Sequence, residues 1–302
     1  MTTTPSSTTR KGRLSRIRSG NGFTSVLLRA VLKRRDVKVG LGILFFFVAL
    51  DIVSVFYLPY NPRATVYVGF PAPPIPPSWK YLFGTTDIGQ DVFSQWMYGT
   101  QATLLVGFLA ALLTAALGIT TGIVAGYINF WDEPLMRSAD VILTLPALPL
   151  LIVVASFYRT TDYSIALLIA ILAWAGMSRT IRSAVLSLKH QPFVEVAELS
   201  NVPRWKIMFV DMFKHTLPLI LTYSLFAVGG AILTVASLDF IGVGPVTDYS
   251  WGSMISLAND ASALLDHPAA WWWPIPPGLS IAILITGLAL IAYGLEAAFK
   301  NM

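Results

Sequence analysis

Residues 103–128 read TLLVGFLAALLTAALGITTGIVAGYI and include no charged side chain. A helix needs roughly 20 apolar residues to cross the hydrocarbon core of a bilayer, and this stretch is longer. The strands of a membrane β-barrel instead show segments of about ten residues with alternating hydrophobicity. The stretch therefore predicts a transmembrane helix.

The rest of the chain has the same character. Hydrophobic residues make up 55% of the 302 positions and charged residues only 12%, against roughly 25% charged in an average soluble domain. Five further apolar runs near this length lie at 39–58, 138–157, 163–178, 217–242 and 275–296. We therefore expect an all-α integral membrane protein with about six transmembrane helices.

The positive charges indicate how the chain is oriented. If successive loops alternate between the two sides, 18 of the 21 Lys and Arg residues share one side, and Arg63, Lys80 and Arg159 lie opposite. Cytoplasmic loops carry an excess of Lys and Arg, so the richer side is predicted to be cytoplasmic. Both termini then face the cytoplasm, and the net charge of +5 reflects membrane orientation rather than nucleic-acid binding.

These features divide the chain into four parts. Residues 1–38 are expected to form a basic cytoplasmic tail with an amphipathic helix that binds membrane lipid. The first transmembrane helix follows at 39–58, and an external loop with the proline-rich sequence PAPPIPP covers 59–101. Residues 102–302 then form a five-helix core with a cytoplasmic loop at 179–216.

Small residues and prolines in the core predict how its helices pack. Gly118, Gly122 and Gly126 recur every four residues, which lets another helix approach closely. We expect ordinary packing within the bundle, with lining of a translocation path or a subunit seam as the alternative. Pro146 and Pro149 are expected to kink the third span.

Charged and aromatic residues near the membrane boundaries carry further expectations. Asp51 lies inside the first apolar run but close to its outer end, so a structural or interfacial role is favoured over a functional one. Arg137 and Asp140 have the i to i+3 spacing of a local ion pair. The three tryptophans at 271–273 are expected to anchor the chain in the headgroup layer, with an aromatic cage as the alternative.

The sequence lacks the residues of a self-contained enzyme. It has no cysteine and no phosphate-binding G-x-x-x-x-G-K-[ST] loop. Its three histidines, His190, His215 and His267, do not have the spacing of metal ligands. We therefore expect no catalytic residue, no metal site and no cofactor in this chain, and any use of ATP must depend on another protein.

One motif lies where the external loop meets the second helix, and it reads YLFGTTDIGQDVFSQWMYG at 81–99. This stretch resembles the signature FGTD-x-x-GRD-x-x-SR-x-x-YG of permease subunits of dipeptide and oligopeptide ABC importers, specifically the subunit type with six helices. Gln90 stands where that family usually has Arg, and Thr86 is a spacer. The matching residues are Phe83, Gly84, Thr85, Asp87, Gly89, Asp91, Ser94, Tyr98 and Gly99.

Further resemblance follows in the family's order through 122–146, 179–200, 229–244 and 250–256. It implies a type I ABC importer permease that moves peptides, delivered by an extracytoplasmic solute-binding protein, across the plasma membrane of a prokaryote. The other partners would be a second homologous permease and two ATP-binding subunits, which would hold ATP and Mg²⁺. Relatives that carry oligosaccharides or nickel chelates have very similar permeases, so those substrates stay open.

The resemblance also assigns a role to the cytoplasmic loop, which reads EVAELSNVPRWKIMFVDMFKHTLP at 195–218. It is similar to the EAA loop of ABC permeases, a short coupling helix that docks on the ATP-binding subunit. The resemblance places Glu195, Val196, Ala197, Glu198 and Asn201 in this role, with Val196 replacing Ala and Asn201 replacing Gly. Taken from spacing alone, the two glutamates would instead be solvated charges on a loop helix.

The physical chemistry of the loop supports a helix, a turn and a second helix. Asn tolerates the left-handed conformation that often ends a helix, and Pro203 suits the first turn of the next one. The Leu-Pro pair at 217–218 arrives four residues later than in the family. An amphipathic helix under the membrane is expected in between, with one stripe formed by Trp205, Met208, Phe209 and Met212.

Two other classes of protein compete with this hypothesis. An ion-coupled secondary transporter or channel should show several intramembrane acidic groups and often an internal repeat, and neither is clear in the sequence. A membrane-embedded hydrolase needs a nucleophile and base or a metal cluster, which is missing.

The predicted orientation can be tested by cysteine labelling, because the chain has no native cysteine. We expect a single cysteine introduced at Ser78 or Thr247 to react from outside intact cells. A cysteine introduced at Ser187 or Asn201 should react only after permeabilisation. Labelling of the Ser187→Cys variant from outside would overturn the orientation given by the charges.

Overall fold

The computed structural model describes residues 34–66, 74–245, 249–265 and 270–300. Most of the basic tail, together with Thr247 and His267, lies outside these residues. The described residues form helices and no strand. Five helices are long and apolar enough to cross a membrane, or six if one sharply bent pair counts as a single span. The expected all-α membrane fold is therefore confirmed.

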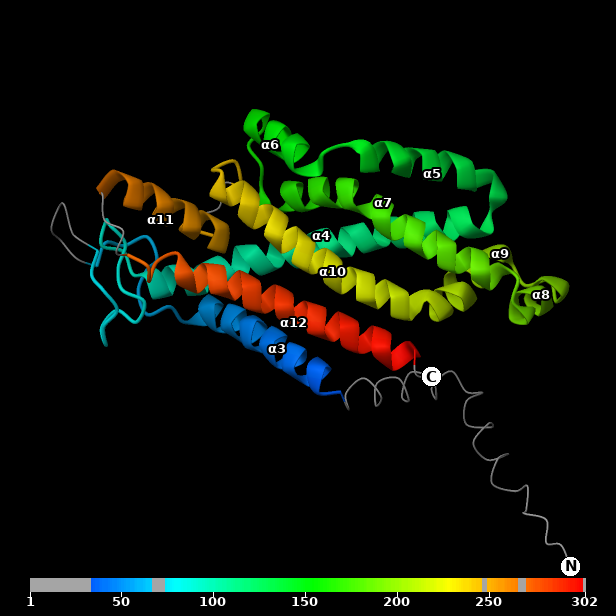
Figure 1. Ribbon diagram of the computed structural model, residues 1–302, viewed down its shortest axis with the longest axis horizontal. Helices are drawn as coiled ribbons and strands as arrows, with labels where there is room; N and C mark the ends of the chain where they lie inside the picture. Colours follow the sequence, from blue (N-terminus) through cyan, green and yellow to red (C-terminus); the bar gives the residue numbers. More distant parts are fainter. Residues whose placement is uncertain (1–33, 67–73, 246–248, 266–269, 301–302) are drawn as a thin grey trace, which may run out of the picture.

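The helices form an elongated bundle with most of their axes running along its length (Figure 1). In chain order they are α3 (Arg35–Phe56), α4 (Val92–Tyr127), α5 (Asn129–Thr144), α6 (Ala147–Phe157), α7 (Asp162–Lys189), α8 (Pro192–Leu199), α9 (Arg204–Lys206), the π-helical turn η2 (Ile207–Met212), α10 (Phe213–Phe240), α11 (Trp251–Leu265) and α12 (Ile275–Lys300).

Two helices extend beyond the apolar runs that predicted them. The second begins already at Val92, because the Asp91 carboxylate accepts a hydrogen bond of 2.8 Å from the Ser94 backbone N–H and caps the helix. The end of the predicted external loop is therefore helical. The helix α7 likewise continues to Lys189, so the first part of the segment 179–216 is helical.

The third span is broken between α5 and α6, whose axes differ by 79°. Leu145 is extended, with ψ of 132°, because the ring of Pro146 disfavours the helical conformation of the residue before it. Pro149 lies in the first turn of α6, where a missing N–H is tolerated. The predicted kink is confirmed, although it is a break rather than a bend.

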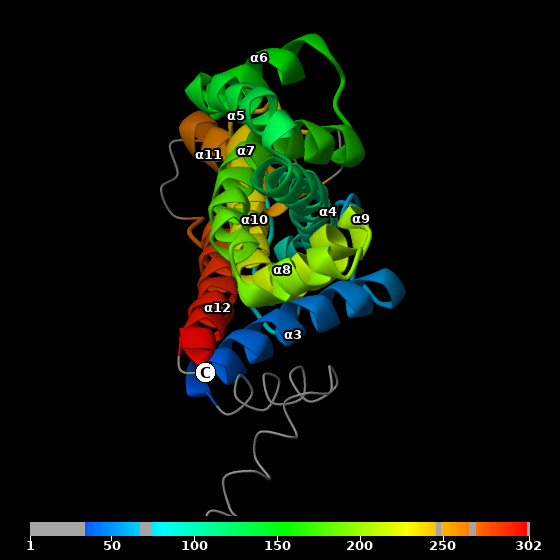
Figure 2. The same cartoon turned by 90° about the vertical axis from the view of Figure 1, so that its right-hand side faces the viewer.

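The most extensive helix contact joins α4 to α7, which lie side by side in Figure 1 and Figure 2. It includes the stripe of Gly118, Gly122 and Gly126. A Cβ atom on Gly122 would lie 2.7 Å from the Ser178 carbonyl oxygen and 2.8 Å from the Ile181 Cβ. The absence of side chains in this stripe therefore allows the two backbones to approach. Packing within the bundle is confirmed as the role of these glycines.

The predicted ion pair between Arg137 and Asp140 is wrong. Arg137 instead contacts Glu133 one turn earlier, with 2.5 Å between its Nη2 and the Glu133 Oε1. Asp140 pairs with Arg179 of α7. Both residues are on α5, and the side of α5 that carries Asp140 faces α7, so the aspartate binds across the helix interface rather than along its own helix.

The tryptophans at 271–273 do not act together as a membrane anchor. Trp272 and Trp273 are buried, with exposed fractions of 8% and 3%, and only Trp271 is exposed. The Trp272 Nε1 donates a hydrogen bond of 3.3 Å to the Thr85 carbonyl oxygen. Trp272 therefore packs against the external loop and Trp273 lies in the hydrophobic core, which leaves Trp271 alone as a candidate interfacial residue.

The glycine stripe gives a paired test of the fold. Gly122→Ala should destabilise the protein by about 1–3 kcal/mol, because its Cβ overpacks the α4–α7 contact. The matched variant Gly176→Ala, where no atom lies within 4 Å of the added Cβ, should be neutral or stabilising. Thermal unfolding of the detergent-solubilised protein would measure both, and equal melting temperatures would refute the close approach.

Candidate functional site

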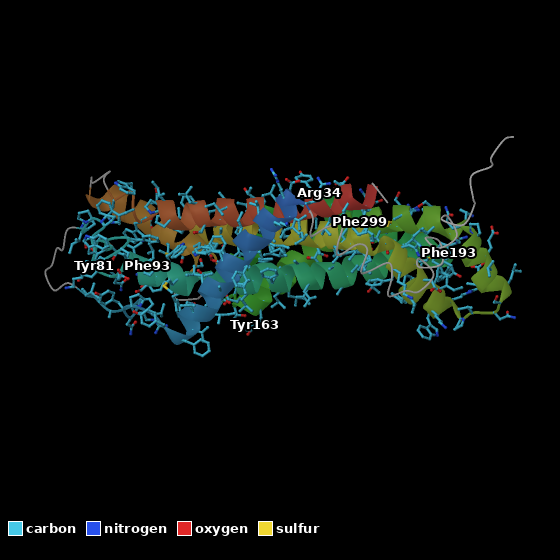
Figure 3. All side chains as sticks on the ribbon, turned by 90° about the horizontal axis from the view of Figure 1, so that it is seen from below. Arg34, Tyr81, Phe93, Tyr163, Phe193 and Phe299 are labelled. Atoms are coloured by element: carbon cyan, nitrogen blue, oxygen red, sulfur yellow. The ribbon has the colours of Figure 1, made fainter. Side chains whose placement is uncertain are left out.

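The site predicted from the sequence lies in the segment that joins α7 to α10, at the end of the molecule opposite the external loop. Figure 3 labels Phe193 of α8 at one end and Tyr81 and Phe93 at the other. Phe193 stacks on His215, with 4.4 Å between the ring centroids. Val194 of α8 is only 1% exposed and packs into the hydrophobic cluster between α4, α7 and η2. The short helix therefore has one face fixed to the bundle.

The turn after α8 is a Schellman motif centred on Asn201. The Asn201 N–H donates to the Glu198 carbonyl oxygen and the Val202 N–H to the Ala197 carbonyl oxygen, both at 3.0 Å. Asn201 has φ of 54° and, among the described residues, is the only one other than glycine with positive φ. The predicted left-handed conformation is confirmed.

The predicted stripe on the following helix is wrong. Met208 and Met212 are buried, whereas Trp205 is 63% and Phe209 40% exposed. The reason is the π-helical turn, in which more residues fit into each turn and the buried face shifts to include Ile207. The segment from Arg204 also continues into α10 as one helix of 37 residues, so it is the first part of a candidate span rather than a separate helix.

The five predicted coupling residues point in different directions. Glu195 and Val196 are exposed, Ala197 packs inward, and the Glu198 carboxylate accepts a hydrogen bond of 2.7 Å from the Tyr127 hydroxyl. Leu199 is the most exposed of the segment's apolar residues at 84%, and sequence reasoning missed it. The sequence could have indicated Leu199, because it lies four residues after Glu195 and residues four apart share one face of a helix. We call Glu195, Val196 and Leu199 the outward face of α8.

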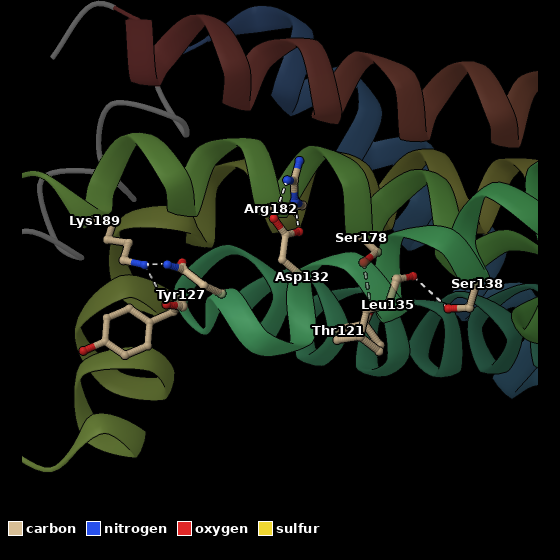
Figure 4. Close-up of polar contacts among 9 residues, drawn as sticks. Thr121, Tyr127, Asp132, Leu135, Ser138, Ser178, Arg182 and Lys189 are labelled. Atoms are coloured by element: carbon tan, nitrogen blue, oxygen red, sulfur yellow. Dashed lines mark hydrogen bonds and ion pairs between the residues drawn. The ribbon is translucent and has the colours of Figure 1, made fainter.

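Polar contacts fix the scaffold behind this helix (Figure 4). The Lys189 ammonium, at the end of α7, donates to the Tyr127 carbonyl oxygen at 2.9 Å and to the Asn129 Oδ1 at 2.8 Å. Arg182 of α7 forms a two-pronged ion pair with Asp132 of α5, one prong measuring 2.6 Å. The ends of α4 and α7 and the start of α5 are thereby joined just before α8.

The external motif residues lie at the other end and build a compact cap. Gly84 and Gly89 have φ of 66° and 75°, which favours glycine, and the Phe83 ring packs edge-on against Phe93. Burial raises the pKa of the Asp91 carboxyl, while its hydrogen bonds from Ser94 oppose that rise. Thr85 is fully buried, Asp87 is partly exposed, and all these residues are remote from α8.

Gln90, which departs from the family pattern, links three segments of the cap. Its Oε1 accepts hydrogen bonds from the Gln95 Nε2 at 2.6 Å and from the Tyr249 hydroxyl at 2.9 Å. Its Nε2 donates to the Arg63 carbonyl oxygen at 3.1 Å. Burial raises the pKa of the Tyr249 hydroxyl still further above neutral pH, in agreement with its role as a donor. A neutral amide thus holds the external loop, α4 and the segment before α11 together.

Comparison with known proteins identifies the chain's family. Residues 118–301 match the family described as "binding-protein-dependent transport system inner membrane component". The chain belongs to this family. The match includes α7, α8 and α10, and so the whole candidate site. It decides against an ion-coupled transporter, a channel or a membrane hydrolase.

Individual relatives come from Brucella. A protein of Brucella suis biovar 1 with the provisional name of peptide permease protein is 32% identical over 245 residues, which are 80% of this chain and 79% of the relative. A similarly named protein of Brucella ovis is 31% identical over the same shares. A second Brucella suis protein, provisionally named a peptide transport system permease protein, is 30% identical over 89% of this chain and 88% of its own. This chain is a membrane permease component of the same family.

The turn after α8 offers a test with a matched pair of substitutions. Asn201→Gly should leave the melting temperature nearly unchanged, because glycine adopts positive φ without strain. Asn201→Val should destabilise the segment by about 1–2 kcal/mol, because a β-branched residue is strained there. Thermal unfolding with limited proteolysis of the 190–206 segment would measure this, and two indistinguishable variants would contradict the Schellman turn.

Proposed function

We propose that this chain is the permease subunit of an ATP-driven peptide importer, with α8 as its coupling helix. The observation that carries the proposal is the outward face of α8. Val196 and Leu199 are 60% and 84% exposed although both are apolar, and Glu195 is exposed beside them. A short helix with exposed apolar residues and a carboxylate, fixed on its other face, suits docking on a protein partner.

The partner on this face would be an ATP-binding subunit. The chain's own sequence offers no phosphate-cradling loop, so ATP and Mg²⁺ would be held by two such subunits. Glu195 would supply a charged contact, and Leu199 with Val196 the apolar centre of the interface. Glu198 and Ala197 would then position the helix from behind, through Tyr127 and the hydrophobic cluster.

The remaining partners follow from the family. A second homologous permease would complete the path, and an extracytoplasmic solute-binding protein would deliver the solute to the end that carries the cap. Both termini and α8 would face the cytoplasm of a prokaryotic cell, in agreement with the charge distribution. Peptides are favoured over oligosaccharides and nickel chelates because the relatives are named for peptides.

The contacts behind α8 suggest how closure of the ATP-binding subunits reaches the membrane. A displacement of α8 would be passed to α7 through the short connection after Lys189, and to α4 through the bond between Glu198 and Tyr127. The α4–α7 contact along the glycine stripe lets these helices move together. Rigid-body rocking of this unit would provide alternating access.

The test is a reconstituted complex of both permeases and both ATP-binding subunits. Leu199→Ser should weaken binding of the ATP-binding subunits about tenfold, by removing the apolar centre of the contact. Glu195→Ala should lower ATP hydrolysis stimulated by the loaded solute-binding protein while membrane insertion is preserved. Subunit co-purification and stimulated ATPase activity are the measurements.

Leu257→Ser provides the matched control, since Leu257 is 43% exposed on α11 at the opposite end of the bundle. The Leu257→Ser variant should bind the ATP-binding subunits, and support stimulated ATP hydrolysis, as the unmodified chain does. The proposed coupling role of α8 is wrong if Leu199→Ser and Glu195→Ala also behave like the control. ATP hydrolysis by the purified chain without any partner would contradict the division of labour between subunits.

A further inference from the structure

A groove of about 830 Å³ lies between the outer halves of α3 and α4, beside the start of α7. Its size is within the range of about 300–1,000 Å³ typical of small-molecule sites. Figure 3 labels Tyr163, the residue next to the groove's Asp162. The lining residues are Val48, Asp51, Val55, Tyr98, Gln101, Ala102, Leu104, Leu105, Phe108, Leu109, Leu112, Asp162 and Tyr249.

Two acidic residues from different helices line this groove. Asp51 comes from α3 and Asp162 from α7, and each has one buried oxygen, Oδ1, without a hydrogen-bond partner among the described residues. The described part of the chain also provides neither carboxylate with an ion pair. Asp51 lies inside an apolar run, where an acidic group is costly, and the unpaired buried oxygen of each aspartate adds to the cost, so a compensating positive charge is expected.

The donors around the groove are turned toward other partners. The Gln101 Nε2 donates to the Ser54 Oγ at 2.9 Å, and the Ser54 hydroxyl in turn donates to the Asp51 carbonyl oxygen at 2.7 Å. The Tyr249 hydroxyl donates to Gln90 in the cap. The groove therefore offers acceptors and negative charge, which complements a ligand that carries several N–H donors.

The rest of the lining is apolar and comes mainly from α4. Leu104, Leu105, Phe108, Leu109 and Leu112 continue the groove from the acidic end toward the middle of the helix. A metal ion would find too few oxygen ligands here, because calcium takes about six to eight and the described residues contain no group of three or more potential ligand side chains. An organic cation with an apolar part matches both ends of the groove.

We propose that this groove binds a small amphipathic solute that carries an ammonium group, with Asp51 and Asp162 supplying negative charge along the groove and the α4 wall in contact with the solute's apolar part. The inference deepens the proposed function, on which it rests, because a peptide carries such an ammonium at its amino terminus. It gives Asp51 a functional role in place of the structural or interfacial one favoured by the sequence.

The groove's charge can be measured in the assembled complex without any transport assay. Ala102→Cys places the chain's only cysteine in the lining. The cysteine is labelled separately with a cationic trimethylammonium methanethiosulfonate and with an anionic sulfonate methanethiosulfonate. The ratio of the first labelling rate to the second defines the cation preference of the groove. We expect this preference to fall about tenfold when Asp51→Asn and Asp162→Asn are combined, because two carboxylates no longer attract the cationic reagent.

A matched control and a ligand pair complete the experiment. Asp260→Asn, which removes an exposed aspartate of α11 that does not line the groove, should leave the preference unchanged. Dialanine amide, which carries an ammonium, should slow labelling of Ala102→Cys, and N-acetyl dialanine amide should not.

Four outcomes would overturn the inference. The first is that Ala102→Cys is not labelled at all, which would mean that another subunit or lipid fills the groove, and the second is that the cation preference survives the double Asn substitution. The third is an equal loss of the cation preference in Asp260→Asn, and the fourth is equal protection of the cysteine by the two peptides. None of these four outcomes contradicts the proposed function if the complex still shows solute-stimulated ATP hydrolysis. Loss of that hydrolysis in the unmodified complex would instead reject the proposed function.

Discussion

The close approach of α4 and α7 is the constraint on which the rest of the structure depends. It requires glycine at three successive turns of α4, where any Cβ would meet the backbone or the Cβ atoms of α7. Once these two helices are in contact, Thr121 reaches Ser178, with 2.8 Å between the hydroxyl oxygens, and Tyr127 reaches Glu198 on α8. The position of the candidate coupling helix is therefore set by backbone packing tens of residues away in sequence.

The sequence predicted what depends on residues near one another in the chain. Continuous apolar runs identified the spans, Pro146 the break, and Asn201 the left-handed turn, because local steric preferences decide these features. It failed where another helix decides the partner. Asp140 binds Arg179 across a helix interface, and two of the three adjacent tryptophans are buried inside the protein. The predicted apolar stripe of Trp205, Met208, Phe209 and Met212 was wrong for a third reason. It assumed the residue spacing of an α-helix, whereas the segment contains a π-helical turn with more residues per turn.

The resemblance of the loop to the EAA loop indicated the candidate site more clearly than residue spacing or hydrophobicity did. The structure separates its residues into those that face solvent and those that contact the bundle. Exposed residues and residues that contact the bundle alternate along α8, because one turn of helix presents both a face toward the bundle and a face toward solvent. Spacing alone would have grouped Glu195 with Leu199, yet it gave no reason to separate Glu198, whose partner Tyr127 is 71 residues away. Long-range pairs of this kind are not visible in a single sequence.

The two ends of the bundle are held by different kinds of force. The cap depends on neutral hydrogen bonds through Gln90, whereas the end that carries α8 depends on charge pairs such as Arg182 with Asp132. Salt screens charges near water and leaves neutral amide bonds nearly unaffected. A Gln in place of the family's Arg thus gives the cap, on the side predicted to be external, a cohesion that is insensitive to changing salinity. The charged end lies on the side predicted to face the regulated ionic medium of the cytoplasm.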